Sequence, residues 1–261
     1  MKRRLILCTH SSLYSSRVLE VLVAAPHIEL VGIVNSTRVL TAKGPPLADI
    51  RRLLQRSGLR YALHLWLATS GFELLAPGRR LKAQARRLGI PVLDIADINN
   101  ADGLAFVRAL GPDVCLSAYF NQIVREPLLS LPRFGCINIH PSLLPRNRGV
   151  DPLFHARLRG ESEGGVTLHR LDAELDTGPV LAQQGSTLNH DQSLMAGYEQ
   201  LFRIGAALAV DAIAKLDDRQ SGQAQQGQGN YDGWPDRAAV AKVRGLLGLR
   251  EYWRVLRNRP E

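Results

Sequence analysis

The sequence has few of the features that mark secreted or membrane-spanning proteins. It contains three cysteines in 261 residues, Cys8, Cys115 and Cys136, and each lies within an apolar run. An odd number of cysteines placed in this way predicts buried, reduced thiols in a cytoplasmic protein. The opening MKRRLILCTHSS has a four-residue apolar run, which is shorter than a secretory signal requires. The longest apolar stretch, residues 61–75, is interrupted by polar residues and a glycine, so no membrane span is expected.

The patterns of several ligand-binding classes are also missing. The loop at residues 9–16 has hydroxyl side chains but no Gly-x-Gly-x-x-Gly pattern, which disfavours NAD binding. The scattered histidines form no cluster with the spacing of metal ligands, so we expect no metal. The net charge is +9, but its arginines occur in scattered doublets without a nucleic-acid-binding motif. We interpret this charge as an arginine-rich solvated surface, with nucleic-acid binding as the alternative.

What the sequence does contain is typical of an α/β protein with an open, mostly parallel, Rossmann-like sheet. Apolar runs at 4–8 and 28–35 flank a helical pattern at 15–25, with Ser15 or Ser16 as the N-cap. A strand, helix and strand of these lengths predict a parallel, right-handed crossover. Further strands are expected at 91–95, 113–120, 135–140, 164–172 and 178–186, and helices at 45–58, 79–88, 101–110, 122–131, 152–160 and 193–216.

Composition divides the chain into three parts. Residues 1–216 carry the α/β pattern and form the main domain. Residues 217–230 are rich in Gly, Gln and Ser, which predicts a flexible linker, and residues 231–261 look like a short helical extension. The least regular part of the main domain is 45–88. We expect it to be buried packing, with a lid over a pocket or a dimer surface as alternatives.

The stretch INIHPSLLP, residues 137–145, places two polar side chains at the end of an apolar strand. Asn138 and His140 are two residues apart, so they share one face of the strand. Open α/β sheets bind ligands beyond the carboxyl ends of their strands, which is where these side chains are expected. Downstream, Asp176-Thr177-Gly178-Pro179 predicts a tight turn that could return a carboxylate to this edge. Each residue alone is commonly structural, so the argument depends on the whole set.

With these residues, the sequence resembles the folate-dependent formyltransferases. The likeness is carried by NIHPSLLPRNRG (138–149), by GVTLHRLDAELDTGPVLAQQ (165–184) and more weakly by LSAYFNQIV (116–124). It covers residues 88–216 and extends to the first 35 residues as a matching strand–helix–strand opening. The family includes glycinamide ribonucleotide transformylase, methionyl-tRNA formyltransferase, sugar N-formyltransferases and the hydroxyornithine transformylases of siderophore pathways.

The resemblance implies a catalytic trio of Asn138, His140 and Asp176 with 10-formyltetrahydrofolate as co-substrate. Asn138 and a protonated His140 would donate to the carbonyl oxygen as it gains negative charge. Asp176 would hold His140 in its cationic form and accept the proton of the attacking amine through a water.

The resemblance also suggests residues that contact the two substrates. The folate site would be formed mainly by backbone groups of two segments and by Cys136 as an apolar wall. The residues concerned are Leu116, Ser117, Tyr119, Cys136, Leu171, Asp172, Ala173, Glu174 and Leu175. Ser142 and His169 match positions near the reaction centre, and Asp151 is available for a cationic acceptor. Asp151 is also expected to be the N-cap of the helix that begins at Pro152.

The sequence indicates the formyl acceptor less clearly than the type of reaction. The tRNA enzymes carry a β-barrel after the catalytic domain, whereas the residues after Leu216 look helical. Purine-pathway transformylases use a glycine-rich first loop that is missing here. We therefore expect a small-molecule amine or hydroxylamine, hydroxyornithine first and a nucleotide-linked amino sugar as the alternative. A protein that binds folate or nucleic acid without catalysis is a third reading. No membrane or nucleic-acid partner is expected, and a homodimer is left open.

Overall fold

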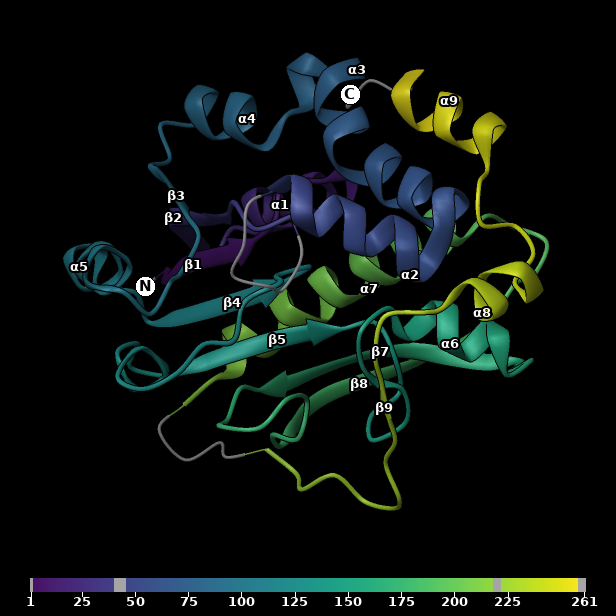
Figure 1. The fold of residues 1–261 in the computed structure, drawn as a ribbon. Helices are drawn as coiled ribbons and strands as arrows, with labels where there is room; N and C mark the ends of the chain where they lie inside the picture. Colours follow the sequence, from purple (N-terminus) through teal and green to yellow (C-terminus); the bar gives the residue numbers. More distant parts are fainter. Residues whose placement is uncertain (1, 40–45, 218–221, 258–261) are drawn as a thin grey trace.

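The computed structural model describes residues 2–39, 46–217 and 222–257, and its central feature is a seven-stranded sheet (Figure 1). The strand order is β3-β2-β1-β4-β5-β7-β8. The first five of these are parallel, and β7 and β8 run antiparallel to their neighbours. The strands are β1 (Arg3–Thr9), β2 (Ile28–Ser36), β3 (Val92–Ile95), β4 (Val114–Ala118), β5 (Cys136–His140), β7 (Glu163–Arg170) and β8 (Val180–Thr187). The predicted α/β class with an open, mostly parallel sheet is confirmed.

The opening strand–helix–strand unit forms as predicted, except at its helix start. Helix α1 (Leu13–Ala24) joins β1 to β2, which pair in parallel. Its N-cap is Ser12, and the predicted Ser15 and Ser16 lie inside the first turn. The Ser12 hydroxyl accepts from the Ser15 N–H, and the Ser15 hydroxyl accepts from the Ser12 N–H. This capping box needs a hydroxyl at both positions, which explains the serine-rich loop.

Residues 46–87 form a run of helical pieces beside the sheet. Helix α2 (Pro46–Trp66) is interrupted at Gly58, whose φ of 79° only glycine adopts easily. A π-helical turn (Leu67–Gly71), α3 (Phe72–Leu75), a 3₁₀ turn (Pro77–Arg79) and α4 (Leu81–Arg87) follow. The predicted helix at 45–58 begins at Pro46 within the described residues and ends at Gly58 as predicted, and a second helical segment follows to Trp66. Residue 45 lies outside the described residues.

One predicted helix, at 122–131, is wrong. Only Leu128–Ser130 form a 3₁₀ turn there, and the preceding residues are irregular. Pro127 has no N–H to donate to a helix. The Gln122 side chain binds the backbone of the neighbouring loop instead, since it accepts from Ile98 N–H at 2.8 Å and donates to Ile95 O at 2.9 Å.

Two layers of helices cover the sheet. Helices α1 and α7 (Leu194–Lys215) pack against each other on one face, in the larger apolar cluster. Helix α5 (Ala101–Leu110) packs on β2 and β3 at the other face. All three cysteines lie in the smaller cluster on that side and are buried and free, as predicted. A Cβ on Gly205 of α7 would lie 2.3 Å from the Ile139 Cγ2, so glycine lets this helix approach β5 closely.

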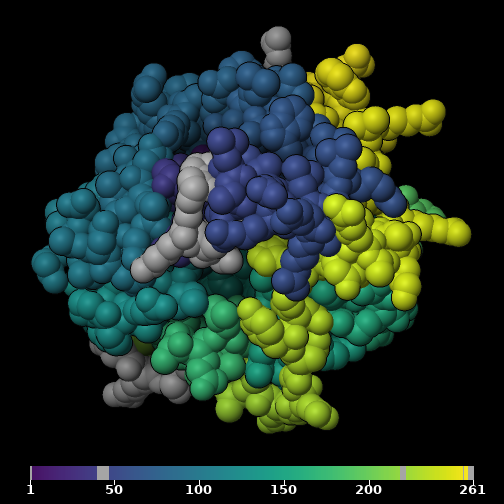
Figure 2. Space-filling view, in the orientation of Figure 1, coloured from purple at the N-terminus to yellow at the C-terminus, as the bar shows by residue number. Residues whose placement is uncertain are grey.

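The C-terminal part of the chain runs back over the sheet edge. Strand β6 (Arg148–Gly149), which lies just before α6 (Pro152–Leu158) in the chain, pairs with β9 (Tyr231–Asp232). Helices α8 (Arg237–Lys242) and α9 (Leu249–Arg257) follow. Figure 2 shows this segment, in yellow, lying against α2, and the Ser57 hydroxyl donates to the Pro235 carbonyl at 2.6 Å.

The proposed division into a main domain, a linker and an extension stays a prediction. Residues 218–221 of the predicted linker and 258–261 of the predicted extension lie outside the described residues. Within the described part, no helix is both long and apolar enough to cross a membrane.

Candidate active site

Strand β5 delivers Asn138 and His140 to the same face of the sheet, as predicted. The alternate residues Ile137 and Ile139 are buried in the larger core, beneath α7. The antiparallel pairing with β7 sets His169 opposite Asn138 and Thr167 opposite His140. Three of these four polar side chains, all but that of Asn138, are buried, and His140 is the last residue of β5. The strand end is therefore built from polar side chains that touch one another.

His169 fixes the orientation of the Asn138 carboxamide. Its ring is fully buried, and its Nδ1 lies 2.8 Å from the Arg170 carbonyl oxygen, to which it donates. Burial lowers the pKa of His169 to about 4, although the nearby Asp176 carboxylate opposes this shift. The imidazole is therefore neutral at pH 7, and its Nε2 accepts from the Asn138 Nδ2, 3.1 Å away. The second N–H of this half-buried amide is left for another acceptor.

Asp176 lies between the two imidazoles. Its Oδ1 is 3.5 Å from the His140 Nδ1 and 3.7 Å from the His169 Nε2. Its Oδ2 accepts the Gly149 N–H at 2.9 Å. The side chain is only 12% exposed. The structure thus brings Asp176, 36 residues beyond His140 in the sequence, to the strand end that carries Asn138 and His140.

The ring of His140 is held on both sides, which differs from the expectation that it donates to a substrate. Its Nε2 lies 2.8 Å from the Asn147 carbonyl oxygen, and its Nδ1 faces Asp176. The residue is only 4% exposed. In this arrangement neither ring nitrogen is directed at a ligand, so Asn138 is the member of the trio with a donor to offer.

The turn that carries Asp176 depends on its backbone and on a distant glutamine. Asp176 has a left-handed φ of 57°. A Cβ on Gly178 would lie 1.9 Å from the Arg170 carbonyl oxygen, so only glycine fits there. The Gln225 Nε2 donates to the carbonyl oxygens of both Asp176 and Gly178, at 2.8 and 2.9 Å.

Sequence reasoning missed three residues that support the trio: Asn147, Gly149 and Gln225. The first two have positive φ angles of 58° and 96°, and the Asn-Arg-Gly pattern was a usable signal for that turn. Gln225 lies in a stretch of Gly and Gln that gives no such signal.

The residues expected to contact folate fall into two groups. The side chains of Leu116 and Cys136 belong to the two cores, and the backbone of β4 pairs with a strand on each side, so neither offers a ligand any surface. Ser117 is also buried, and Tyr119 is half-buried against Tyr14. The loop after β7 is accessible, since Leu171 and Asp172 are half-buried and Ala173, Glu174 and Leu175 are exposed.

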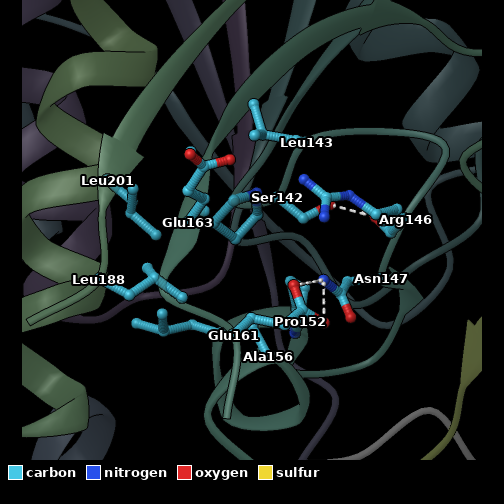
Figure 3. A pocket seen from close by; sticks show the side chains of 14 residues that line it. Ser142, Leu143, Arg146, Asn147, Pro152, Ala156, Glu161, Glu163, Leu188 and Leu201 are labelled. Carbon is cyan, nitrogen blue, oxygen red and sulfur yellow. Dashed lines mark hydrogen bonds between the residues drawn. The ribbon is translucent and has the colours of Figure 1, made fainter. Parts of the chain in front are cut away.

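The residues expected near the acceptor are also placed apart from each other. Ser142 is buried, and its hydroxyl donates to the Arg146 carbonyl oxygen at 2.8 Å. It lines a small pocket whose walls include no member of the trio (Figure 3). Asp151 precedes α6, but its side chain does not cap the helix, contrary to the expectation from the sequence. Its carboxylate instead accepts hydrogen bonds from two tyrosine hydroxyls, those of Tyr61 and Tyr198.

No metal centre is evident in the described part of the chain, where no three His, Cys, Asp or Glu side chains are grouped to hold an ion.

Comparison with known proteins agrees with this geometry. Residues 93–213, which hold the whole trio, match the family model described as formyl transferase. The chain is 41% identical over 149 residues to a methionyl-tRNA formyltransferase of Halorhodospira halophila, covering 57% of this chain and 47% of that protein. It thus spans less than half the length of this curated relative.

Solved structures share the fold. A glycinamide ribonucleotide transformylase from Symbiobacterium toebii superimposes with a TM-score of 0.57 at 16% identity, covering 87% of this chain and 95% of that one. A sugar N-formyltransferase from Shewanella sp. FDAARGOS_354 gives a TM-score of 0.56 at 17% identity, covering 88% and 76%. Over residues 93–213, the sequence of this chain is thus similar to that of formyl transferases.

Proposed function

We propose that this protein transfers a formyl group from 10-formyltetrahydrofolate to the amine or hydroxylamine of a small molecule. The observation that carries the proposal is the cluster at the carboxyl end of β5, where Asp176 faces both His140 and His169 and His169 holds the Asn138 amide. An amide donor beside a carboxylate–imidazole pair supplies both functions that acyl transfer to an amine requires. One group stabilises the developing oxyanion, and the other takes up a proton.

The roles of the trio follow from its hydrogen bonds. Asn138 is oriented by the neutral His169, so its second N–H is pre-positioned to donate to an oxygen that gains negative charge. Asp176 accepts the proton lost by the attacking amine, directly or through a water, and a proton passes to the folate nitrogen as its bond to the formyl carbon breaks. His140 shares that proton with Asp176 through Nδ1, while its Nε2 is held by the Asn147 carbonyl oxygen.

The loop at residues 171–175 fits a folate ring better than any other predicted contact. When bound, the co-substrate supplies the formyl group. Ala173, Glu174 and Leu175 are exposed, and the structure assigns their backbone groups no hydrogen bond within the part of the chain it describes. Leu175 adds an apolar side chain that is 44% exposed. Free N–H and C=O groups beside an apolar side chain suit a flat heterocycle with polar edges.

Hydroxyornithine is the acceptor that we favour, in a siderophore pathway, and a nucleotide-linked amino sugar is the alternative. The H. halophila relative is named for a tRNA substrate, but the match covers less than half of that protein. We therefore place a tRNA acceptor and non-catalytic folate binding behind hydroxyornithine and the nucleotide-linked amino sugar. A cytoplasmic location and a homodimer remain predictions.

An acceptor panel tests this proposal. Purified protein with 10-formyltetrahydrofolate is given hydroxyornithine, a nucleotide-linked 4-amino sugar, glycinamide ribonucleotide or methionyl-tRNA, and tetrahydrofolate release is measured. We expect turnover with one of the first two. Turnover with methionyl-tRNA alone would show that the acceptor is a tRNA and not a small molecule. Folate binding without turnover on any acceptor would favour a binding protein and contradict the proposed reaction.

A further inference from the structure

A carboxylate held by tyrosines lies close to the trio. Both oxygens of Asp151 accept hydrogen bonds, Oδ2 from the Tyr61 hydroxyl of α2 and Oδ1 from the Tyr198 hydroxyl of α7. The Tyr198 hydroxyl also accepts the Leu153 N–H at 2.9 Å. Tyr61 is fully buried and Tyr198 is 5% exposed, whereas Asp151 is only half-buried. The carboxylate is thus fixed from behind by two rigid side chains and still reaches the surface.

The Asp151 carboxylate forms no ion pair in the described part of the chain, although its charge acts on Arg157 and His64. Within the part of the chain that the structure describes, no Lys, Arg or His nitrogen lies within 4 Å of its carboxylate. A half-buried carboxylate without a cationic partner is costly, because hydrogen bonds replace only part of its hydration. The backbone adds to this cost, since Asp151 has a left-handed φ of 53°. A structural link between two helices would not need a charged residue in this conformation.

Two further tyrosines pack next to Tyr198 and Asp151, of which Tyr14 is buried and Tyr119 half-buried. Tyr14 of α1 packs edge-on to Tyr119, with ring centroids 4.9 Å apart, and lies 5.7 Å from the Tyr198 ring. The Tyr14 hydroxyl is buried and has no hydrogen-bond partner among the described residues. Burial, together with the charge of Asp151, raises the pKa of both Tyr14 and Tyr119, so both phenols stay protonated. Aromatic rings around a carboxylate form the type of surface that recognises an ammonium group.

The chain connects this surface to the trio. Gly149 donates its N–H to the Asp176 carboxylate, and Asp151 is two residues further along. Because consecutive Cα atoms are about 3.8 Å apart, the Cα atoms of Gly149 and Asp151 are within about 8 Å. This separation matches an acceptor whose two nitrogens are a few carbons apart.

We infer that Asp151, held in place by the buried Tyr61 and Tyr198 and adjoined by the half-buried Tyr119, binds a second, protonated amine of the acceptor. The inference rests on the proposed function and narrows its substrate class. The acceptor has one nucleophilic amine or hydroxylamine, which faces the trio, and one ammonium group, which pairs with Asp151. A hydroxylamino amino acid has both groups. A nucleotide-linked amino sugar lacks the second amine, and its diphosphate would be repelled by the carboxylate.

Two acceptors that differ only in the ammonium group test the inference by activity. They are N5-hydroxyornithine and 5-(hydroxyamino)pentanoic acid, which lacks the α-amine, and kcat/KM is measured for each. The wild type is expected to prefer hydroxyornithine by about ten- to a hundredfold, as expected for a hydrogen-bonded charge pair. Asp151→Asn keeps the shape and is expected to bring this ratio close to one. Glu163→Gln, at an exposed carboxylate on β7, is the charge-matched control and is expected to retain the preference.

A purely structural role for Asp151 predicts a different result. Asp151→Asn would then lower the melting temperature and both kcat/KM values together, and the preference would remain, which would overturn the inference. The ratio is taken within one preparation, so a partly unfolded sample does not affect it. A wild type without any preference would overturn the inference as well.

A binding measurement separates this inference from the proposed reaction. Ornithine and 5-aminopentanoic acid are titrated calorimetrically into the wild type and Asp151→Asn without folate. Tighter binding of ornithine that is lost in Asp151→Asn supports the ammonium site, even if no acceptor is formylated. Equal affinities in both proteins contradict it, even if formyl transfer is observed.

Discussion

At the scale of single residues, the candidate site depends on which protons are present and where they point. The carboxamide of Asn138 is turned by a neutral imidazole, and a carboxylate faces the other imidazole. The two histidines thus have different roles, because the His169 Nε2 accepts from the Asn138 amide, whereas the His140 Nε2 is held by the Asn147 carbonyl oxygen. The sequence predicted the trio, but it could not predict that His140 would be held at both nitrogens.

Asn138→Ala is predicted to reduce kcat for formyl transfer by about a hundred- to a thousandfold, since it removes the one donor directed at the oxyanion. The buried His169 Nε2 would lose its hydrogen-bond donor, so a modest fall in melting temperature is expected as well. Steady-state kinetics with the best acceptor and a thermal melt of the same sample measure both effects. An unchanged kcat would mean that the oxyanion is stabilised elsewhere.

His169 predicts a pH dependence of stability. Its pKa is about 4 in the folded protein and near 6.5 in the unfolded chain, so between these values only the unfolded chain binds the proton. Stability therefore falls as the pH decreases from 6.5 toward 4, by about 1.5 kcal/mol from this residue between pH 6.5 and pH 5.

Urea unfolding of the wild type and of His169→Gln at these two pH values tests this prediction. The variant should lose less stability than the wild type on acidification, because it lacks this titrating group. Equal losses in the two proteins would show that His169 is protonated in the folded state.

At the scale of helices and strands, local patterns predicted well what local forces determine. The strand–helix–strand opening, α5, β5 and α7 follow from apolar periodicity. The helix expected at 122–131 failed because Gln122 uses its side chain for the neighbouring loop, which is a contact between distant residues. The support of the Asp176 turn by Gln225 was missed for the same reason, since 49 residues separate the two.

Gln225→Ala is predicted to lower kcat by about tenfold, because the turn that carries Asp176 loses two hydrogen bonds, each worth about 0.5–1.5 kcal/mol. Gln226→Ala is the matched control, since Gln226 is exposed and one residue away. The two variants are compared by kcat and by KM for folate. Equal kinetics of the two would show that the turn keeps its shape without Gln225.

At the scale of the whole molecule, the C-terminal segment bears on both the fold and the site. The β6–β9 pairing joins it to the loop that hydrogen-bonds to the trio. Arg56 and Ser57 of α2 donate hydrogen bonds to the C-terminal segment, and Arg237 of that segment donates one to α2. Composition predicted a separate extension there, because low apolar content around residues 217–230 resembles that of a linker. Such a pattern cannot show that residues of a polar segment are hydrogen-bonded to the backbone of another part of the chain.

If the extension is part of one cooperative unit, a residue buried at its far end should affect the stability of the whole chain. Tyr252 of α9 is 3% exposed and lies in the main core cluster, whereas its neighbour Trp253 is 56% exposed. Tyr252→Ala is predicted to lower the free energy of unfolding by about 3 kcal/mol, and Trp253→Ala by less than about 0.5 kcal/mol. Urea unfolding followed by circular dichroism should give one transition in both variants, shifted only for Tyr252→Ala. Two transitions, with only a minor one shifted, would show that α9 unfolds independently and that the sheet and the trio stay folded without it.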